Sequence, residues 1–299
     1  MQFISFQQSL LACSHHVQKS MDALLQDINI ESKIVEAMRY SALSNGKRVR
    51  PFLLMATANV FGFPLKKAVL ASCALEFIHV YSLIHDDLPA MDNDDYRRGI
   101  LSNHKKFDEA TAILAGDALL TYAFEILSKP ETHPNPEIRC EIIRIIASSV
   151  GHKGMIGGQM IDIENFNKQI SKEQITNIHR LKTGELFMAS AECGAIIGGA
   201  SIEERKALRF FAHDLGLIFQ IKDDILDHHD RSINSLTGKL SHKNSKENTS
   251  IVAIIGLEKS HQQLDFIKEQ AKEHIRIFGD KARFLIELVD FVADRSESK

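Results

Sequence analysis

The sequence predicts an all-α protein, and three observations support this prediction. Apolar residues recur at helical spacing over most of the 299 residues. Alternating apolar runs joined by hairpin dipeptides, the usual signal of strands, are missing. Capping patterns and prolines stand where the helical periodicity stops. We therefore expect about ten helices that form a single domain over residues 1–299.

The N-terminal helices can be placed from their ends and their apolar rows. Gly46 suits the C-terminus of one helix, and Pro51 suits the first turn of the next. Every fourth residue from Val69 to His85 is apolar or aromatic until the row meets Asp86. Because Pro89 cannot lie comfortably inside a helix, this buried helix should end or kink near Asp87. The acids that follow would then gather in a loop.

The later helices are separated by loops of distinct composition. Residues 129–136 hold three of the six prolines and predict a loop. Residues 230–248 are rich in Ser, Asn, Lys and His and predict a mobile polar loop. Helices are expected between these loops and after them, from apolar stripes and from capping boxes at Ser171 and Ser201; the stripes cover residues 142–150, 208–219 and 251–271.

Composition excludes several classes of function. The net charge of −3 offers no basic field for nucleic acid or for anionic lipid. We find no apolar run that approaches the ~20 residues needed to span a bilayer. The first residues lack the basic and apolar regions of a signal peptide. The four cysteines include no Cys-x-x-Cys pair, so we expect reduced thiols and a cytoplasmic protein.

One stretch concentrates the charged chemistry of the chain. Five carboxylates fall within residues 86–95, and Arg97 and Arg98 follow at once. Acids this close repel one another unless a cation lies among them, and carboxylate oxygens suit Mg²⁺ or Ca²⁺. An arginine pair suits a phosphate group. The stretch therefore predicts a site for a metal–phosphate complex, although a first motif alone would often be a solvated loop.

A second acidic cluster lies far downstream at Asp223, Asp224 and Asp227. Asp223 and Asp227 are four residues apart and share one helix face, where two like charges are mildly destabilising without a counter-ion. Taken alone they could be surface acids. Their apolar neighbours make full exposure unfavourable, so the two clusters together predict one site that binds a polyanion from both sides.

Taken together, the two clusters and the motifs around them resemble the trans-prenyl diphosphate synthases, most closely the bacterial short-chain farnesyl diphosphate synthases. The resemblance covers essentially the whole chain. It rests on Asp86-Asp87-x-x-x-x-Asp92 with Arg97-Arg98-Gly99, Asp223-Asp224-x-x-Asp227, Gly46-Lys47-Arg48-x-Arg50-Pro51, His79, Gly116-Asp117, Gly158-Gln159-x-x-Asp162 and Lys182-Thr183-Gly184.

The resemblance implies a helical bundle around a deep cavity, a homodimer, and several Mg²⁺ ions that hold an allylic diphosphate between the two Asp motifs. It assigns the metal to Asp86, Asp87, Asp92, Asp223, Asp224 and Asp227. It assigns isopentenyl diphosphate to Lys47, Arg50, His79 and Arg98. It assigns the allylic diphosphate to Arg97, Lys182, Thr183, Gln220 and Lys239, with Lys182, Thr183 and Gln220 as the catalytic group at the reacting carbon.

The implied reaction is a Mg²⁺-dependent condensation of isopentenyl diphosphate with dimethylallyl or geranyl diphosphate through an allylic cation. Tyr81 lies five residues before Asp86, about 7.5 Å along a helix. Its ring could form the floor of the cavity, or it could be plain core. In bacterial relatives, an aromatic residue here together with four residues between Asp87 and Asp92 goes with a C15 product. We therefore expect farnesyl diphosphate, with geranyl and geranylgeranyl diphosphate as the alternatives.

The chain departs from the family pattern in two places. Lys222 puts a cation directly before the second Asp motif, where Gln or Asp is usual. In the polar loop Gly238-Lys239 is present, but Lys246 is displaced and residues 249–252 replace the usual Thr-Tyr-Pro segment. These changes leave the role of Lys246 open.

Blander and rival interpretations remain. His79 could be a core histidine, Lys47 and Arg50 could cap a helix, and Gln159 and Asp162 could merely hold neighbouring helices. An HD-type phosphohydrolase would not need the second Asp cluster. A terpene cyclase would not need the isopentenyl diphosphate set. A non-catalytic partner subunit would be expected to lose its Asp motifs, and both are intact here.

Overall fold

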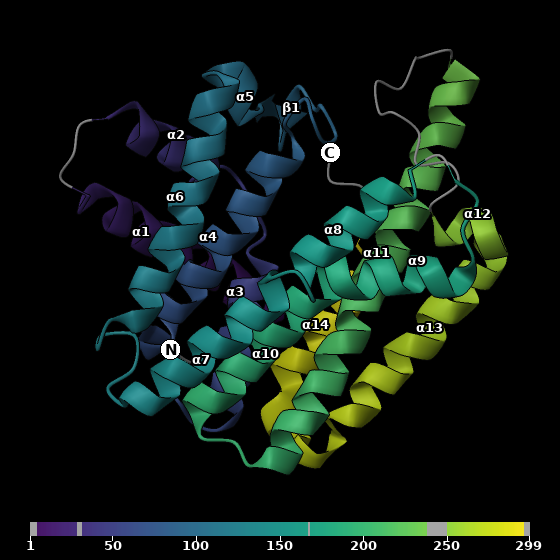
Figure 1. The fold of residues 1–299 in the computed structure, drawn as a ribbon. Coiled ribbons are helices and arrows are strands. Elements are labelled where there is room, and N and C mark those ends of the chain that lie inside the picture. The colour runs from purple at the N-terminus through teal and green to yellow at the C-terminus, as the bar shows by residue number, and fades with distance from the viewer. Residues whose placement is uncertain (1–4, 29–31, 167, 238–249, 296–299) are drawn as a thin grey trace. The chain divides into compact units, whose positions relative to one another are not determined.

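The computed structural model describes residues 5–28, 32–166, 168–237 and 250–295. It is almost entirely helical, so the predicted all-α class is confirmed. The chain divides into two compact units, residues 1–143 and 144–299, and the boundary falls inside helix α7 (Pro136–Val150). Figure 1 shows the elements of each unit.

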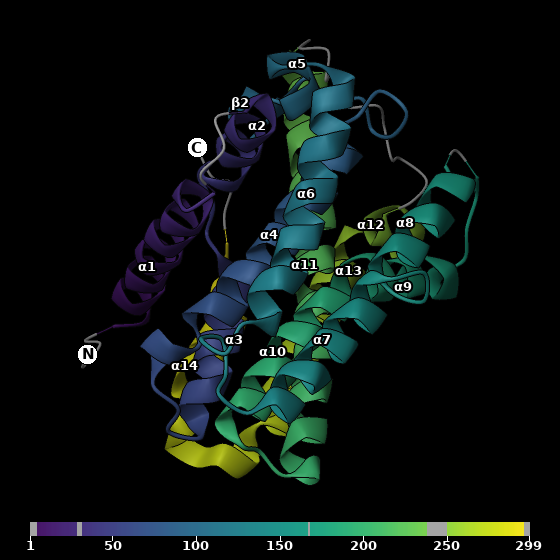
Figure 2. The same cartoon turned by 60° about the vertical axis from the view of Figure 1, so that its left-hand side comes forward.

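The first unit is built around helix α4 (Val69–Asp86). Most of its residues are buried, which fits its apolar sequence, and it packs against four other helices. Figures 1 and 2 both show α6 running alongside it. The elements of this unit are α1 (Phe6–Gln26), α2 (Lys33–Ala42), α3 (Val49–Val60), η1 (Leu65–Lys67), α4, β1 (Tyr96–Arg97), β2 (Ile100–Leu101), α5 (Asn103–Lys106) and α6 (Glu109–Ser128).

The second unit is built around the long helix α11 (Ile202–Thr237). Helices α10, α13 and α14 pack along it, and the rings of Phe187 on α10 and Phe219 on α11 lie 5.4 Å apart. Its elements are α8 (Met155–Glu164), α9 (Lys172–His179), η2 (Arg180–Gly184), α10 (Glu185–Gly198), α11, α12 (Ile251–Ile255), α13 (Leu257–His274), η3 (Arg276–Ala282) and α14 (Arg283–Ala293).

Several helix boundaries confirm the sequence predictions. Helix α4 ends at Asp86, three residues before Pro89. Pro51 lies in the first turn of α3, and Pro136 opens α7 after the predicted proline-rich loop. The capping box at Ser171 forms in full, and at Ser201 the backbone N–H donates to Glu204, whose own N–H donates to the Ser201 hydroxyl.

Other boundaries were predicted wrongly. Helix α11 continues to Thr237, through the first part of the predicted polar loop, because no Gly or Pro interrupts residues 230–237. Residues 238–249, with Lys239 and Lys246, lie outside the described residues. The apolar stretch 251–271 is not one helix but α12 and α13, which Gly256 separates at a φ of 85°. Short helices such as α5 make the elements more numerous than about ten.

Two further expectations need correction. Gly46 does not cap a helix, because α2 already ends at Ala42 and Leu43 is its C-cap. Helix α6 is also long and apolar enough, by length and composition alone, to cross a membrane. A core helix of a soluble protein passes the same test, and α6 packs along α4 and α2.

The four cysteines form no disulfide, as expected from their spacing. Cys13, Cys73 and Cys193 are buried, whereas Cys140 on α7 is exposed. Burial, with a smaller contribution from Glu76, raises the pKa of the Cys13 thiol to about 12 and also raises that of Cys73.

Candidate active site

The first Asp motif folds back on itself at the end of α4. The backbone N–H of Asp92 donates to the carbonyl of Asp86 at 2.9 Å, so residues six apart in sequence become neighbours. Asn93 follows in a left-handed conformation, with a φ of 52°, and its N–H donates to the Leu88 carbonyl, which adds a second bond across the turn. Pro89 prevents the helix from continuing. The fold-back brings together the backbones of Asp86 and Asp92, the two first-motif residues most favoured as metal ligands, but the described residues hold no group of three or more Asp, Glu, His or Cys side chains arranged to hold a metal ion.

Asp87 has a different partner from its neighbours in this motif. It is 2 % exposed and accepts hydrogen bonds from Nε and Nη2 of Arg97, the first at 2.9 Å. Arg97 also donates to Asp94 at 2.9 Å. Burial raises the pKa of the Asp87 carboxyl, and the hydrogen bonds from Arg97 oppose that shift. In this structure Asp87 therefore orients Arg97.

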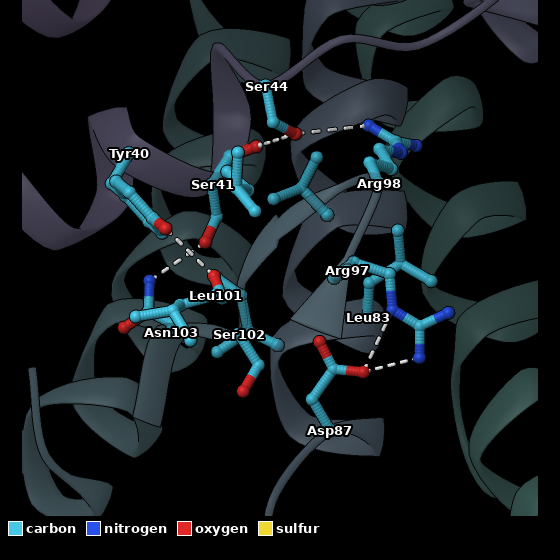
Figure 3. A pocket seen from close by; sticks show the side chains of 13 residues that line it. Tyr40, Ser41, Ser44, Leu83, Asp87, Arg97, Arg98, Leu101, Ser102 and Asn103 are labelled. Carbon is cyan, nitrogen blue, oxygen red and sulfur yellow. Dashed lines mark hydrogen bonds and ion pairs between the residues drawn. The ribbon is translucent and has the colours of Figure 1, made fainter. Parts of the chain in front are cut away.

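A hairpin that the sequence did not predict positions the two arginines. Strands β1 and β2 pair Arg97 with Ile100, and the turn between them consists of Arg98 and Gly99. Both have positive φ, 53° and 81°, as a type I′ turn requires. The pair Arg98-Gly99 is the sequence signal that could have revealed this turn. It separates the two arginines, so that Arg97 faces Asp87 while Arg98 reaches toward the loop after α2 (Figure 3).

Arg98 lies among the residues predicted to bind isopentenyl diphosphate. Its Nη2 lies 3.4 Å from Nε2 of His79, and its Nη1 donates to the Ser44 hydroxyl at 3.5 Å. A Cβ added at Gly46 would lie 2.9 Å from the Arg98 guanidinium, so the glycine makes room for that side chain. The pocket under the hairpin is lined from α2, α4 and the hairpin itself, including Ser44, Asp87 and both arginines.

His79 is surrounded by cations. Burial lowers its pKa well below 6.5, and the charges of Arg50, Arg98, Arg48 and Arg97, in decreasing order, lower it further. The imidazole is therefore neutral at physiological pH, and its Nε2 can accept from Arg98. A region with this much positive charge and an exposed Lys47 beside it suits a polyanion.

Arg48 is a residue whose role the sequence reasoning missed. It is buried, has a φ of 50°, and pairs with Glu76 of α4 at 2.5 Å. It also donates to the carbonyls of Ala42 and Ser44. These bonds fix the loop that carries Lys47 and leads to Arg50 in the first turn of α3. The signal was Glu76 itself, the one acid of α4 before its terminal Asp86, since buried acids need a partner.

The second Asp motif lies on α11, and its carboxylates have distinct partners. Asp224 accepts from the backbone N–H of Ile251 at 2.6 Å, at the start of α12, and lies 3.9 Å from His179. Asp223 accepts from Arg295 at 2.6 Å. Asp227 lies one turn beyond Asp223 and is partly exposed. As in the first motif, the two adjacent aspartates have different partners: Asp224 bonds to the start of α12, and Asp223 bonds to Arg295.

Lys182 and Thr183 lie in a π-helical turn, η2, which is an uncommon conformation often found at functional sites. Lys182 donates to Asp162 of α8 at 2.7 Å, and Thr183 is buried. The turn fits because two neighbours are glycines: a Cβ at Gly158 would lie 2.4 Å from the Lys182 backbone nitrogen, and one at Gly216 would lie 2.9 Å from Gly184. Gln220 follows Gly216 by one turn of α11 and so shares its face.

Comparison with known proteins supports the resemblance. The polyprenyl synthetase family model matches residues 31–282, across the boundary of the two units. A farnesyl diphosphate synthase of Geobacillus stearothermophilus is 38% identical over 96% of this chain and 97% of its own length. Geranylgeranyl pyrophosphate synthase 4 of Arabidopsis thaliana is 39% identical over 97% of this chain and 78% of its own length.

Solved structures agree with this relationship. The chain matches a geranyltransferase of Legionella pneumophila with a TM-score of 0.86 and 33% identity, over 97% of this chain and 98% of that one. It matches an apo FPP/GFPP synthase of Zymomonas mobilis with a TM-score of 0.84 and 36% identity, over 96% and 98%. The likeness thus spans sequence and fold over nearly the whole chain. The protein belongs to the polyprenyl synthetase family and is a prenyltransferase.

Proposed function

We propose that this prenyltransferase condenses isopentenyl diphosphate with dimethylallyl and then geranyl diphosphate, and that its main product is farnesyl diphosphate. Bacterial relatives named farnesyl diphosphate synthases, from Geobacillus stearothermophilus and Micrococcus luteus, are 38% and 39% identical to the chain. One structural observation carries the proposal. The fold-back of Asp92 onto Asp86 and the cluster of Arg98 and His79 both lie at the same end of α4.

Mg²⁺ is the cofactor that we propose for this site. The available donors are carboxylate oxygens, which are hard ligands of the kind that Mg²⁺ prefers. The fit is best at Asp86 and Asp92, whose backbones are hydrogen-bonded to each other, and at Asp223 and Asp227, which share a helix face. When bound, Mg²⁺ would neutralise the charge that develops on the departing diphosphate. Asp87 and Asp224, held by Arg97 and by α12, would support the site rather than coordinate the metal.

The residues near His79 would bind isopentenyl diphosphate. Arg50, Arg98 and Lys47 carry fixed positive charge, and Arg98 can form a bidentate pair with a phosphate. His79 stays neutral, so it would accept the hydrogen bond of Arg98 and leave the remaining donors of that side chain for the ligand. The buried Arg48–Glu76 pair would keep this loop in place.

The second unit would supply the groups that act at the reacting carbon. Lys182 now pairs with Asp162, and we propose that it turns to the allylic diphosphate when that anion binds. Thr183 and Gln220 would stabilise the allylic cation through their oxygens. Arg97, which lies in the first unit, remains a sequence-based prediction for this diphosphate. Lys239, which lies outside the described residues, remains a sequence-based prediction for the same diphosphate.

Geranylgeranyl diphosphate synthesis is the second candidate. It is favoured by relatives named geranylgeranyl synthases, such as those of Arabidopsis thaliana and Cyanophora paradoxa, at 39% and 40% identity. Tyr81 favours the C15 product instead, because it is a bulky buried residue on α4 that precedes Asp86 by five positions. A terpene cyclase is less favoured, because it would not need the arginines around His79.

Product analysis tests the proposal. The full chain would be incubated with isopentenyl diphosphate and either dimethylallyl or geranyl diphosphate, with Mg²⁺ or with EDTA. The prenyl chains would be identified after dephosphorylation. A C15 chain that forms only with the metal is the expected result. A C20 chain would refute the C15 assignment, equal yield in EDTA would refute the metal, and a cyclic hydrocarbon would favour the cyclase.

We also propose that the protein works as a cytoplasmic homodimer. The resemblance implies a dimer, and the free thiols suit a reducing compartment. Light scattering after gel filtration of the purified protein would test the dimer, since a molecular mass near 34 kDa would indicate a monomer.

A further inference from the structure

Arg295, the last of the described residues, reaches the second Asp motif. It follows α14 and donates from Nη2 to Oδ1 of Asp223 at 2.6 Å and to the backbone carbonyl of Phe219 at 2.6 Å. Its guanidinium lies 4.0 Å from the centroid of the Phe219 ring. These three contacts bind one side chain to a single turn of α11, directly beside a predicted metal ligand.

The cation is buried, but the carboxylate that it contacts is open to solvent. The Arg295 side chain is 12% exposed and that of Asp223 is 40% exposed. Nε of Arg295 is buried and has no hydrogen-bond partner among the described residues. The charge of Asp227 also acts on the guanidinium. Arg295 therefore lies among the motif's carboxylates, whereas ions from solvent can still reach Asp223.

We propose that Arg295 is a built-in counter-ion of the second Asp motif, which neutralises Asp223 in the metal-free protein and competes with a divalent cation for that carboxylate. The inference rests on the proposed metal site. A guanidinium and a metal ion both need the negative charge of Asp223. Even two single positive charges about 4 Å apart repel by about 1 kcal/mol in water, so a divalent ion is repelled at least as strongly. Metal binding would therefore have to displace or oppose Arg295.

A purely structural role would have a different consequence. The bond to the Phe219 carbonyl and the stacking on its ring could anchor the end of the chain without Asp223. If Arg295 only oriented Asp223 for the metal, its removal would weaken metal binding. Competition predicts the opposite sign, so one measurement separates the two roles.

The measurement is the affinity of the substrate-free full chain for Mn²⁺, followed by the electron paramagnetic resonance signal of free Mn²⁺. Replacing Arg295 with Gln is expected to tighten binding roughly fivefold, the change that corresponds to about 1 kcal/mol. The matched control is Arg283→Gln, which removes an equal charge from a side chain that is 58% exposed and pairs with Glu287. The control variant should bind Mn²⁺ like the wild type.

A third variant, Asp223→Ala, tests whether the measured Mn²⁺ binds at this motif, because it should weaken Mn²⁺ binding. In the Asp223→Ala background, Arg295→Gln should have no further effect on that binding. Circular dichroism would verify that each variant is folded. Unchanged or weaker binding in Arg295→Gln would overturn the inference. Equal binding by wild type and Asp223→Ala would overturn it together with the metal site, whereas product analysis reports on chain elongation independently.

Discussion

Adjacent aspartates in each motif have unlike surroundings. The Asp87 carboxylate is buried against Arg97, whereas the backbone carbonyl of Asp86 next to it accepts from the N–H of Asp92. Asp224 holds the first turn of α12, whereas Asp223 contacts Arg295. Consecutive residues of a helix point about 100° apart, so a pair of adjacent acids cannot serve one ion equally. A substitution at Asp87 is therefore expected to act by releasing Arg97.

The histidine among the arginines predicts a pH dependence of stability. Folding lowers the pKa of His79 below 6.5. As the pH falls below 6.5, the unfolded chain therefore binds a proton at His79 while the folded protein leaves it neutral. The contribution of His79 is thus complete above pH 6.5 and is lost as pH falls below it, by at most ~1.4 kcal/mol per pH unit. Urea unfolding at pH 7.5 and 5.5 should show a smaller loss for His79→Gln than for the wild type. Equal losses would contradict this prediction.

Tyr81 predicts the length of the product. Its ring is buried on α4 and lies edge-on to His85, with centroids 5.6 Å apart. Replacement by Ala would open space before Asp86, so we expect longer prenyl chains in the product analysis. Tyr81→Phe is the matched control. It keeps the ring and removes a buried hydroxyl with no hydrogen-bond partner among the described residues, so product length and stability should hold or improve slightly. An unchanged product from Tyr81→Ala would make Tyr81 plain core.

Residue types in the motifs could be predicted from sequence, but their partners could not. The pattern of acids and arginines predicted a metal–phosphate site at residues 86–98, and the resemblance added His79. Helix α4 and its hairpin bring Asp92 to Asp86 and Arg98 to His79. The pairing of Asp87 with Arg97 depends on a turn with two positive φ angles, which is a tertiary feature. Arg295 belongs to no motif, so only the fold reveals its contact with Asp223.

At the scale of elements, close approach between helices positions the catalytic turn. Helix α8 contacts η2 at Gly158, and α11 contacts it at Gly216. No apolar pattern signals such contacts, which explains why a π-helical turn was not predicted at Lys182. By contrast, the ends of α4 and α9 followed from Pro89 and from the capping box at Ser171. Local sequence signals therefore determine several helix boundaries, whereas packing between helices determines the π-helical turn.

Gly158→Ala should disturb this turn. The new methyl group would lie 2.4 Å from the Lys182 backbone nitrogen, so α8 and η2 must separate. We expect a loss of about 1–3 kcal/mol in unfolding free energy, as for other overpacked cores, together with a fall in kcat. Gly184→Ala is the control for stability, because its nearest neighbour atom would be 3.6 Å away. Equal stability of the two variants would show that Gly158 is not needed for packing.

At the scale of the whole molecule, each Asp motif lies on the central helix of one compact unit. Helix α4 carries the first and α11 carries the second. Each of the two helices packs against several others of its unit, which lets it hold charged groups in fixed positions. The family match runs through both units, so the predicted fold class and family are confirmed.

Mutating both motifs tests whether the two units serve one reaction. Asp86→Ala and Asp223→Ala should each lower kcat/KM by about 10²-fold or more while helix content is retained. If both act on the same diphosphate, the double variant should be little worse than either single one, since groups that act as a unit are not additive. Losses that multiply would instead indicate two independent contributions.

The unequal exposure of the cysteines allows the native protein to be labelled at one site. Three thiols are buried, and burial raises the pKa of Cys13 and Cys73 far above neutrality, whereas Cys140 on α7 is exposed. A maleimide dye at neutral pH should therefore label the native protein once, at Cys140, without any mutagenesis. Because Cys140 lies on α7, close to the boundary between the two units, a spectroscopic probe attached there would report on its local surroundings during turnover.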